Sequence, residues 1–206
     1  MSAKFKAQIL DRLRSIWESA DFNFLDSPRT RKLRDALLTR FLASIMTDDE
    51  RARLYGLPDG CRMRENAKIL SPDRLVCGEY VWIGEGAVLD ASGGLEIGSH
   101  TSIGLGVYIW SHTSVMTNLL VQNEIGSPYI ERKRTRIGSG VFIGGPSVVY
   151  PGVTIGDKVV VLPMSVVTSN VPSYSVVGGA PATVQKTLNE KIIQRMKGKH
   201  DSEAGA

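Results

Sequence analysis

The sequence contains little cysteine and no long apolar run. Cys61 and Cys77 are the only cysteines among the 206 residues, so there is no disulfide framework, which is typical of a reducing compartment. The first ten residues carry two lysines and a glutamine among apolar residues and lack the apolar core of a signal peptide. No run reaches the ~20 apolar residues that a membrane-spanning helix needs. We therefore expect a cytoplasmic protein.

Aromatic residues and excess charge are also scarce. Aromatics make up 7% of the chain and the formal net charge is +4, with the basic residues spread out. This charge is too mild and too dispersed for a nucleic-acid-binding protein, so we expect no nucleic-acid partner. Glycine, by contrast, is abundant, with 21 residues. Few aromatics and many glycines suit a narrow core filled by valine and isoleucine.

The most informative stretch runs from 137 to 168 and reads IGSGVF-IGGPSV-VYPGVT-IGDKVV-VLPMSV-VT. An aliphatic residue, here called the anchor, returns at every sixth position, and the residue two before it is small or β-branched. A period of six fits neither a helix nor an ordinary strand, and is typical of a parallel β-helix. The anchors are Ile137, Ile143, Val149, Ile155, Val161 and Val167.

A six-residue period predicts a triangular coil, because three repeats of one flat face plus one corner close a turn of about 18 residues. Each anchor then points inward and stacks on the anchors of the neighbouring coils. Glycine follows three anchors directly, at Gly138, Gly144 and Gly156, and we interpret it as a bend that needs unusual dihedral angles. These arguments do not fix the hand of the winding, since the right-handed crossover rule would oppose a left-handed coil.

The repeat divides the chain into three parts. Residues 1–60 are expected to form an N-terminal helical extension and linker, with amphipathic helices over about 3–19 and 28–46. Residues 61–180 are the repeat domain: the period begins loosely at Ile69, Leu75 and Val81, slips by two at Gly93-Gly94, and is interrupted by a loop over 116–136. Long loops of this kind are commonly functional. Residues 181–206 are a C-terminal segment with a helix from about 187 to 197.

Three motifs of the second half, PGVTIGD, SVVTSNVP and VVGGAPATVQK, closely resemble the closing segment of hexapeptide-repeat acyltransferases. Within these the chain looks like the sugar O-acetyltransferases of the maltose, galactoside and capsular-polysaccharide type, over roughly 67–186. The resemblance implies an all-β solenoid, a left-handed parallel β-helix of hexapeptide repeats with the N-terminal extension, external loop and C-terminal helix described above. It also implies a homotrimer, acetyl-CoA as donor, a sugar or glycan acceptor, and active sites between subunits.

The implied reaction needs a base that removes the proton of a sugar hydroxyl as it attacks a thioester. Neutral histidine suits this role near neutral pH. His100 and His112 both follow an anchor by three residues, which places both outside the coils near a corner. In family members the catalytic histidine lies just before the external loop, so we expect His112 to be the base and His100 to be the alternative.

The resemblance also indicates where the donor binds. Gly144 and Gly145 match the position that meets the pantetheine end, so a backbone N–H there is the candidate oxyanion donor; both could equally be simple repeat corners. Cofactor contacts map to Gly145, Pro163, Thr168 and Lys186. The loop cations Arg132, Lys133, Arg134 and Arg136 could attract phosphates or could be a solvated surface.

The acceptor pocket is the least defined part. Trp110 beside His112 could stack on a sugar or pack between subunits, and Asn118, Asn123 and Glu124 of the loop could bind sugar hydroxyls or orient the histidine. We expect no metal, because a zinc hydratase on the same scaffold would need three histidine ligands.

Three alternatives remain open: an N-acetyltransferase acting on a nucleotide-linked amino sugar, a non-catalytic trimeric scaffold, and, less favoured than packing against the body, contact of the basic N-terminal helices with a membrane surface.

Overall fold

The computed structural model describes residues 41–122 and 126–204 continuously, with isolated positions between 8 and 40 and side chains mainly up to 198. Contacts divide the chain into two units, Met1–Leu42 and Ala43–Ala206. The expected N-terminal helices lie largely outside the described residues, as do Asn123 and Glu124.

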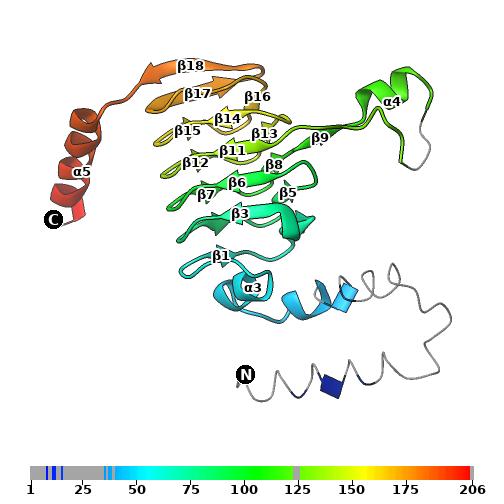
Figure 1. Ribbon diagram of the computed structural model, residues 1–206. Coiled ribbons are helices and arrows are strands. Elements are labelled where there is room, and N and C mark those ends of the chain that lie inside the picture. Colours follow the sequence, from blue (N-terminus) through cyan, green and yellow to red (C-terminus); the bar gives the residue numbers. More distant parts are fainter. Residues whose placement is uncertain are drawn as a thin grey trace. The chain divides into compact units, whose positions relative to one another are not determined.

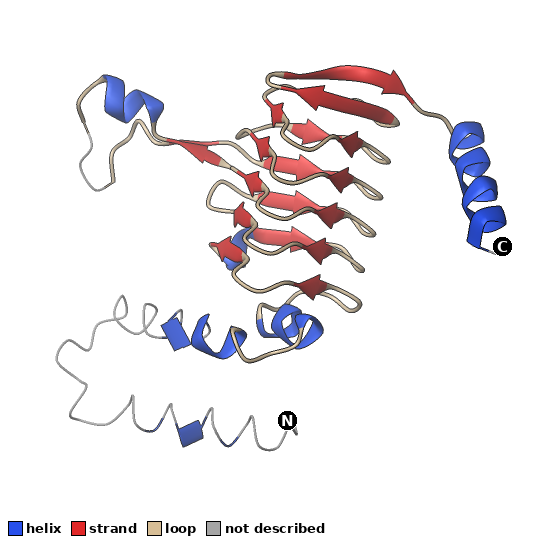
Figure 2. Ribbon diagram, turned by 180° about the vertical axis from the view of Figure 1, so that it is seen from behind, coloured by secondary structure: helices blue, strands red, loops and turns tan. Residues whose placement is uncertain are grey.

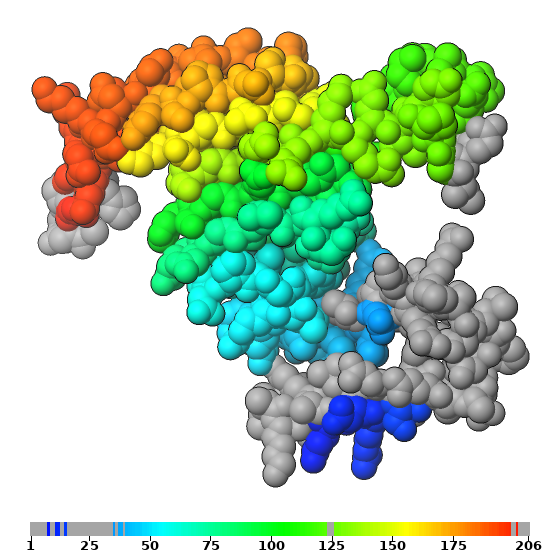
Figure 3. All heavy atoms as spheres, in the orientation of Figure 1, coloured from blue at the N-terminus to red at the C-terminus, as the bar shows by residue number. Residues whose placement is uncertain are grey.

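The second unit is a left-handed parallel β-helix, as predicted (Figure 1). Short strands stack into three sheets, which we name faces A, B and C in chain order. The ladder of parallel strands is visible from the opposite side in Figure 2, and in Figure 3 successive coils follow one another in colour order from cyan to orange.

Each face takes one strand from each coil. Face A consists of β1 (Arg62–Met63), β4 (Trp82–Ile83), β7 (Ser102–Ile103), β12 (Phe142–Ile143), β15 (Val160–Val161), β17 (Ser175–Gly179) and the antiparallel β18 (Ala182–Thr187). Face B consists of β2 (Lys68–Leu70), β5 (Val88–Asp90), β8 (Tyr108–Ile109), β13 (Val148–Val149) and β16 (Val166–Val167). Face C consists of β3 (Leu75–Cys77), β6 (Leu95–Ile97), β11 (Thr135–Ile137) and β14 (Thr154–Ile155).

The anchors fill the core as predicted. Ile137 pairs with Ile97 below and Ile155 above, and the six anchors of the regular stretch are at most 2% exposed. The small residues two positions earlier are also buried. At about 25 cal/mol per Å² of apolar surface, this column of stacked aliphatic side chains is the main source of stability.

Glycine after an anchor serves a purpose other than the predicted one. Gly138, Gly144 and Gly156 do not have positive φ angles; instead, a Cβ at Gly144 would lie 2.8 Å from the backbone nitrogen of Pro163 in the next coil. Close approach of successive coils therefore excludes a side chain there. The left-handed residues come two positions later, at the third residue after an anchor, for example at Gly140 and Lys158.

The loose start of the repeat has a structural cause. Leu75 and Val81, predicted as anchors, occupy the position two before the true anchors Cys77 and Ile83, which pair with Ile97 and Ile103. A 3-10 turn, η2 (Pro72–Arg74), lengthens the first coil between faces B and C. The predicted slip at Gly93-Gly94 lies at the same corner of the second coil, and the external loop at the same corner of the third.

Helices close and extend the coils. Helix α3 (Asp48–Leu54) contacts β1, and the buried Arg51 donates to the carbonyl oxygens of Ala43 at 2.7 Å, Met46 at 2.6 Å and Met63 at 2.5 Å. These bonds satisfy backbone groups at the open end of the solenoid. The loop contains α4 (Val115–Leu119) and a ribbon of β9 (His112–Thr113) with β10 (Glu131–Arg132), and α5 (Glu190–Ala204) is the C-terminal helix.

Candidate active site

Four side chains meet where face B turns towards face C in the second and third coils. Asp90 is the last residue of β5, Ser92 follows it, and Ser111 and His112 lie one coil above, where the chain leaves for the external loop. We call this group the His112 corner. The coils stack so that residues 22 positions apart in sequence come into contact here.

Asp90 and His112 form a close pair. Oδ2 of Asp90 lies 2.6 Å from Nδ1 of His112, and the Oγ of Ser92 lies 3.1 Å from the same nitrogen. The side chain of Asp90 is 0% exposed, whereas that of His112 is 34% exposed. The imidazole is therefore fixed from the inside and accessible from the outside.

Asp90 remains charged despite its burial. Burial raises the pKa of its carboxyl group, but the backbone N–H groups of Ser111 and Ser92, together with His112 and the Ser92 hydroxyl, lower it to about 2. The two backbone bonds measure 2.9 and 3.0 Å. Because a carboxylate can only accept, Nδ1 of His112 carries a proton, and in the neutral ring Nε2 is the nitrogen with the lone pair.

The local sequence explains how this corner forms. The two extra residues at Gly93-Gly94 widen the turn below the histidine, and a Cβ at Gly93 would lie 2.0 Å from the carbonyl oxygen of Ser111. The N–H of Gly93 donates to the Ser111 hydroxyl at 2.8 Å. Only glycine permits this approach.

The aromatic acceptor candidate lies beside the histidine. The ring centroids of Trp110 and His112 are 6.3 Å apart, edge to face, and those of Tyr108 and Trp110 are 6.0 Å apart. Asn118 is exposed on α4. The three rings form a row along the outside of face B that ends at His112.

The donor-site candidates lie at another corner, between faces A and B. The N–H of Gly144 already donates to the carbonyl oxygen of Val161 at 2.8 Å, whereas no described residue accepts from Gly145. Pro163 lies one coil above in contact with Gly144. Gly145 is thus the one of the two glycines whose N–H is not used by the backbone ladder.

One chain does not bring the two corners together. Gly145 precedes β13, and His112 follows the neighbouring parallel strand β8, so they lie beyond opposite ends of face B. The five residue-to-residue steps from Gly145 to Tyr150, which lies level with Trp110, span about 16 Å at ~3.3 Å per step. Thr168 follows β16 at the His112 end of face B, and Lys186 lies in β18 opposite Val176.

Sequence reasoning missed Asp90, Ser92 and Ser111. The available signal was an acidic residue directly after the anchor Leu89, next to the two-residue slip and one coil below the histidine. It could not be read before the length of that coil was known.

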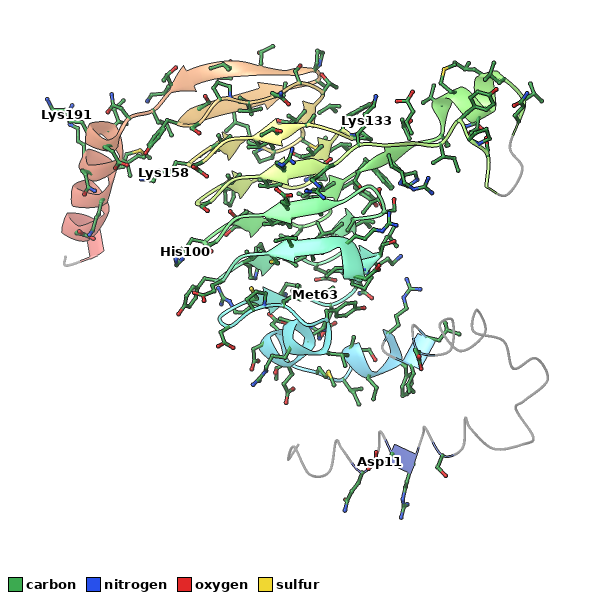
Figure 4. All side chains as sticks on the ribbon, in the orientation of Figure 1. Asp11, Met63, His100, Lys133, Lys158 and Lys191 are labelled. Carbon is green, nitrogen blue, oxygen red and sulfur yellow. The ribbon has the colours of Figure 1, made fainter. Side chains whose placement is uncertain are left out.

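His100, the alternative base, lies at a third corner, between faces C and A. It adopts φ +56°, and its ring stacks on Tyr80 with centroids 5.0 Å apart and an angle of 5° between the planes. Figure 4 shows His100 and Lys158 along one edge of the coils and Lys133, near the loop, on the other side.

Two kinds of feature are absent among the described residues. No set of three His, Cys, Asp or Glu side chains among them is arranged to hold a metal ion. In the same part of the chain, no helix has the length and apolar character needed to cross a membrane.

The known proteins that resemble this chain are acetyltransferases and proteins with hexapeptide repeats. Residues 134–169 match the family model of bacterial transferase hexapeptide repeats. The chain is 31% identical over 136 residues to a putative colanic acid biosynthesis acetyltransferase of Escherichia coli, covering 64% of this chain and 70% of that protein. It is 29% identical over 143 residues to a chloramphenicol acetyltransferase of Agrobacterium fabrum, covering 67% of this chain and 66% of that protein.

A solved structure has the same fold. The hexapeptide-repeat-containing acetyltransferase of Vibrio cholerae, in complex with acetyl-CoA, superposes with a TM-score of 0.60 at 24% identity and covers 84% of this chain and 92% of its own. The repeats, the coils and the sequence identity with the colanic acid protein together show that this chain belongs to the hexapeptide-repeat acetyltransferases.

Proposed function

We propose that this enzyme is an acetyl-CoA-dependent O-acetyltransferase that modifies a hydroxyl of a sugar or polysaccharide precursor, with His112 as general base. The observation that supports it most is the pairing of a buried, charged Asp90 with the accessible ring of His112 at 2.6 Å. A buried carboxylate that orients a histidine is the arrangement a proton-accepting base requires.

The residues account for each proton in the transfer. Nε2 of His112 accepts the hydroxyl proton as the acceptor oxygen attacks the thioester carbonyl carbon, and Asp90 stabilises the imidazolium that forms. When the tetrahedral intermediate collapses, the carbon–sulfur bond breaks and the imidazolium returns the proton to the departing thiolate. The coenzyme leaves as a free thiol and the acceptor carries an ester.

The oxyanion of the intermediate needs a donor that this chain does not place beside its own His112. The N–H of Gly145 is free of the backbone ladder but about 16 Å away along face B. We infer that the neighbouring subunit of a homotrimer supplies Gly145, so that each site lies between two subunits. Pro163 would continue the donor groove along the same corner, with Thr168 and Lys186 contributing further along the coils.

The outer surfaces of the faces fit this assembly. Face A exposes Phe142 and Leu162, and face B exposes Tyr108 and Tyr150, each 40–49% exposed. Face C exposes Val76 in its first strand but carries charged side chains above it, with Glu96 paired with Arg134 and Arg136. Contiguous exposed apolar surface marks an interface, which supports neighbours on faces A and B rather than on face C.

The acceptor is assigned to the row of aromatic rings. Trp110 offers a flat apolar surface beside His112 on which a sugar ring can stack, with Asn118, Asn123 and Glu124 as candidates for its hydroxyls. The colanic acid relative supports a polysaccharide precursor. The chloramphenicol relative supports a second candidate, because chloramphenicol also presents free hydroxyls to such a base. Both cysteines are free, which supports a cytoplasmic location.

The shared site can be tested by mixing two inactive variants. His112→Ala removes the base, and Leu105→Trp obstructs the corner that holds Gly145, where Leu105 is 57% exposed. If the site lies between subunits, random assembly of equal amounts of the two variants into trimers makes about one quarter of all sites complete, so about one quarter of the wild-type activity should be recovered. Released thiol from acetyl-CoA, with sugars, an amino sugar and chloramphenicol as acceptors, reports the activity.

A site made within one subunit would show no recovery on mixing, since every subunit would carry a defect. Acetyl transfer to the amino sugar alone would favour the N-acetyltransferase alternative. A wild-type trimer that neither transfers nor slowly hydrolyses the acetyl group would favour the scaffold.

A further inference from the structure

The external loop returns to the coils directly beside His112. Strand β10 pairs antiparallel with β9, and Arg132 is the residue opposite His112. The N–H of Lys133 donates to the carbonyl oxygen of Ser111 at 2.8 Å. Because hydrogen-bonded and non-hydrogen-bonded pairs alternate, Arg132 and His112 form the latter kind, whose Cα atoms lie about 4.5 Å apart.

Arg132 and His112 project from the same side of this ribbon, since residues directly opposite in an antiparallel pair share a face. The neighbours of Arg132 project from the other side. There, Nζ of Lys133 forms an ion pair with Glu131 at 2.6 Å. The guanidinium of Arg132 is therefore the basic group of the ribbon that faces the histidine.

Among the described residues, Arg132 differs from the other cations of this segment in having no carboxylate partner. Arg134 and Arg136 both bind Glu96, at 2.8 and 3.0 Å, and Lys133 binds Glu131. Within the described residues, Arg132 is exposed and makes no ion pair. The nearby charge of Asp90 is buried and bonded to His112, so it does not neutralise the guanidinium.

We propose that Arg132 binds an oxyanion of the acceptor, a carboxylate or a phosphate, and so selects acidic sugars for acetylation. This inference rests on the proposed function, because it places the acceptor at His112. A guanidinium binds either oxyanion through two parallel hydrogen bonds. An acidic sugar can then present a hydroxyl to Nε2 of His112 while its anionic group is held one side chain away.

The phosphates of the donor do not fit this position. The reacting thioester must lie at His112, and the whole pantetheine arm separates it from the phosphates of the coenzyme. An anion held directly beside the base therefore belongs to the acceptor. Accordingly, loss of Arg132 should affect the acceptor and leave the binding of acetyl-CoA unchanged.

The test compares matched sugars and matched variants of the full chain. Wild type, Arg132→Gln and Lys133→Gln are assayed with acetyl-CoA and with a hexose, its hexuronate and its 6-phosphate in the gluco, galacto and manno series. Lys133→Gln makes the same charge change one residue away, on the opposite side of the ribbon. Thiol release gives kcat and KM, and calorimetry gives the binding of each sugar.

We expect wild type to prefer an acidic sugar to its neutral counterpart. Arg132→Gln should lower kcat/KM for that acidic sugar by about 10- to 100-fold, mainly through KM, as expected for a charge-assisted hydrogen bond. Activity on the neutral hexose and the KM for acetyl-CoA should change by less than about threefold, and Lys133→Gln should behave as wild type. The uronate and phosphate series show which oxyanion is bound.

Equal use of neutral and acidic sugars, or an equal loss on both in Arg132→Gln, would overturn the role of Arg132 while leaving the O-acetyltransferase intact. Acidic sugars that neither react nor bind would also overturn it. Absence of acetyl transfer to every acceptor, including chloramphenicol, would instead reject the proposed function.

Discussion

His100 and His112 occupy the same position of the repeat, yet their surroundings differ. Both are the third residue after an anchor. At His100 the chain makes the regular left-handed turn, with φ +56°, and the ring stacks on Tyr80, the residue in the same position one coil below. At His112 there is no left-handed residue: the chain continues into β9 and the external loop.

The two histidines also differ in the residues that the coil below places beneath them. Beneath His112 the corner contains two additional residues and supplies Asp90 and Ser92 to Nδ1. Beneath His100, the contact that the described residues make with the imidazole ring is the stack on Tyr80. In a solenoid, the repeat thus fixes where a side chain lies, and departures from the repeat in adjacent coils create the chemistry.

The two corners should respond very differently to the same substitution. His112→Ala should lower acetyl transfer by about 10²- to 10⁴-fold, because the base is lost, with trimer formation and coenzyme affinity nearly unchanged. His100→Ala should stay within about twofold of wild type. Steady-state kinetics with coenzyme-binding measurements check both variants, and similar losses in the two would show that the corners do not differ in function.

A smaller effect is expected when the base is kept and its partner is changed. Asp90→Asn offers one acceptor oxygen to a site where two backbone N–H groups, the Ser111 hydroxyl and Nδ1 of His112 converge. Some donors are left unsatisfied and the imidazole loses its fixed tautomer, so kcat should fall by about 10- to 10³-fold.

Ser92→Ala is the matched control, because it removes the hydroxyl, with its 3.1 Å contact to Nδ1 of His112 and its bond to the Asp90 carboxylate, and keeps the backbone bond of residue 92. It should cost less than about fivefold in kcat. If Asp90→Asn retained wild-type kcat, the carboxylate would be a structural group of the corner.

The sequence sufficed for the coils because the hexad pattern is itself the packing rule. Ile137, Ile143 and Val149 recur at the spacing of the faces, and all are buried. Prediction was wrong for Leu75 and Val81, since η2 lengthens the first coil and shifts the phase by two. It was also wrong about why glycine follows an anchor, because contacts between coils cannot be read from one repeat.

The site was harder to predict than the fold for the same reason. His112 could be chosen as the candidate base from its place before the loop, but Asp90 becomes its neighbour only when a 20-residue coil is stacked beneath it. The position of Gly145 at the far end of face B likewise depends on which strands share a sheet. Relations between coils carry the information that a linear reading lacks.

The smallest expected effect is on the stability of the fold in acid. It distinguishes a contribution from the charge of Asp90 from one that depends only on the shape of its side chain. Its pKa is held at about 2 in the folded chain, below the ~3.9 of an unfolded chain. A carboxyl group whose pKa is lower in the folded chain than in the unfolded chain stabilises the fold at pH values above its unfolded-state pKa. This stabilisation is lost as the pH falls to its folded-state pKa. The contribution is therefore about 2 kcal/mol above pH ~4 and is lost between pH ~4 and ~2.

Denaturant unfolding of wild type and Asp90→Asn at a fixed protein concentration, at several pH values from 7 to 2, measures this contribution as a difference. The difference in unfolding free energy should be largest at neutral pH and shrink as the carboxylate is protonated. A difference that stays constant over this range would mean that Asn fails through geometry alone. Since no change at the His100 corner should produce this acid dependence, the measurement shows whether a buried charge is what distinguishes the two corners.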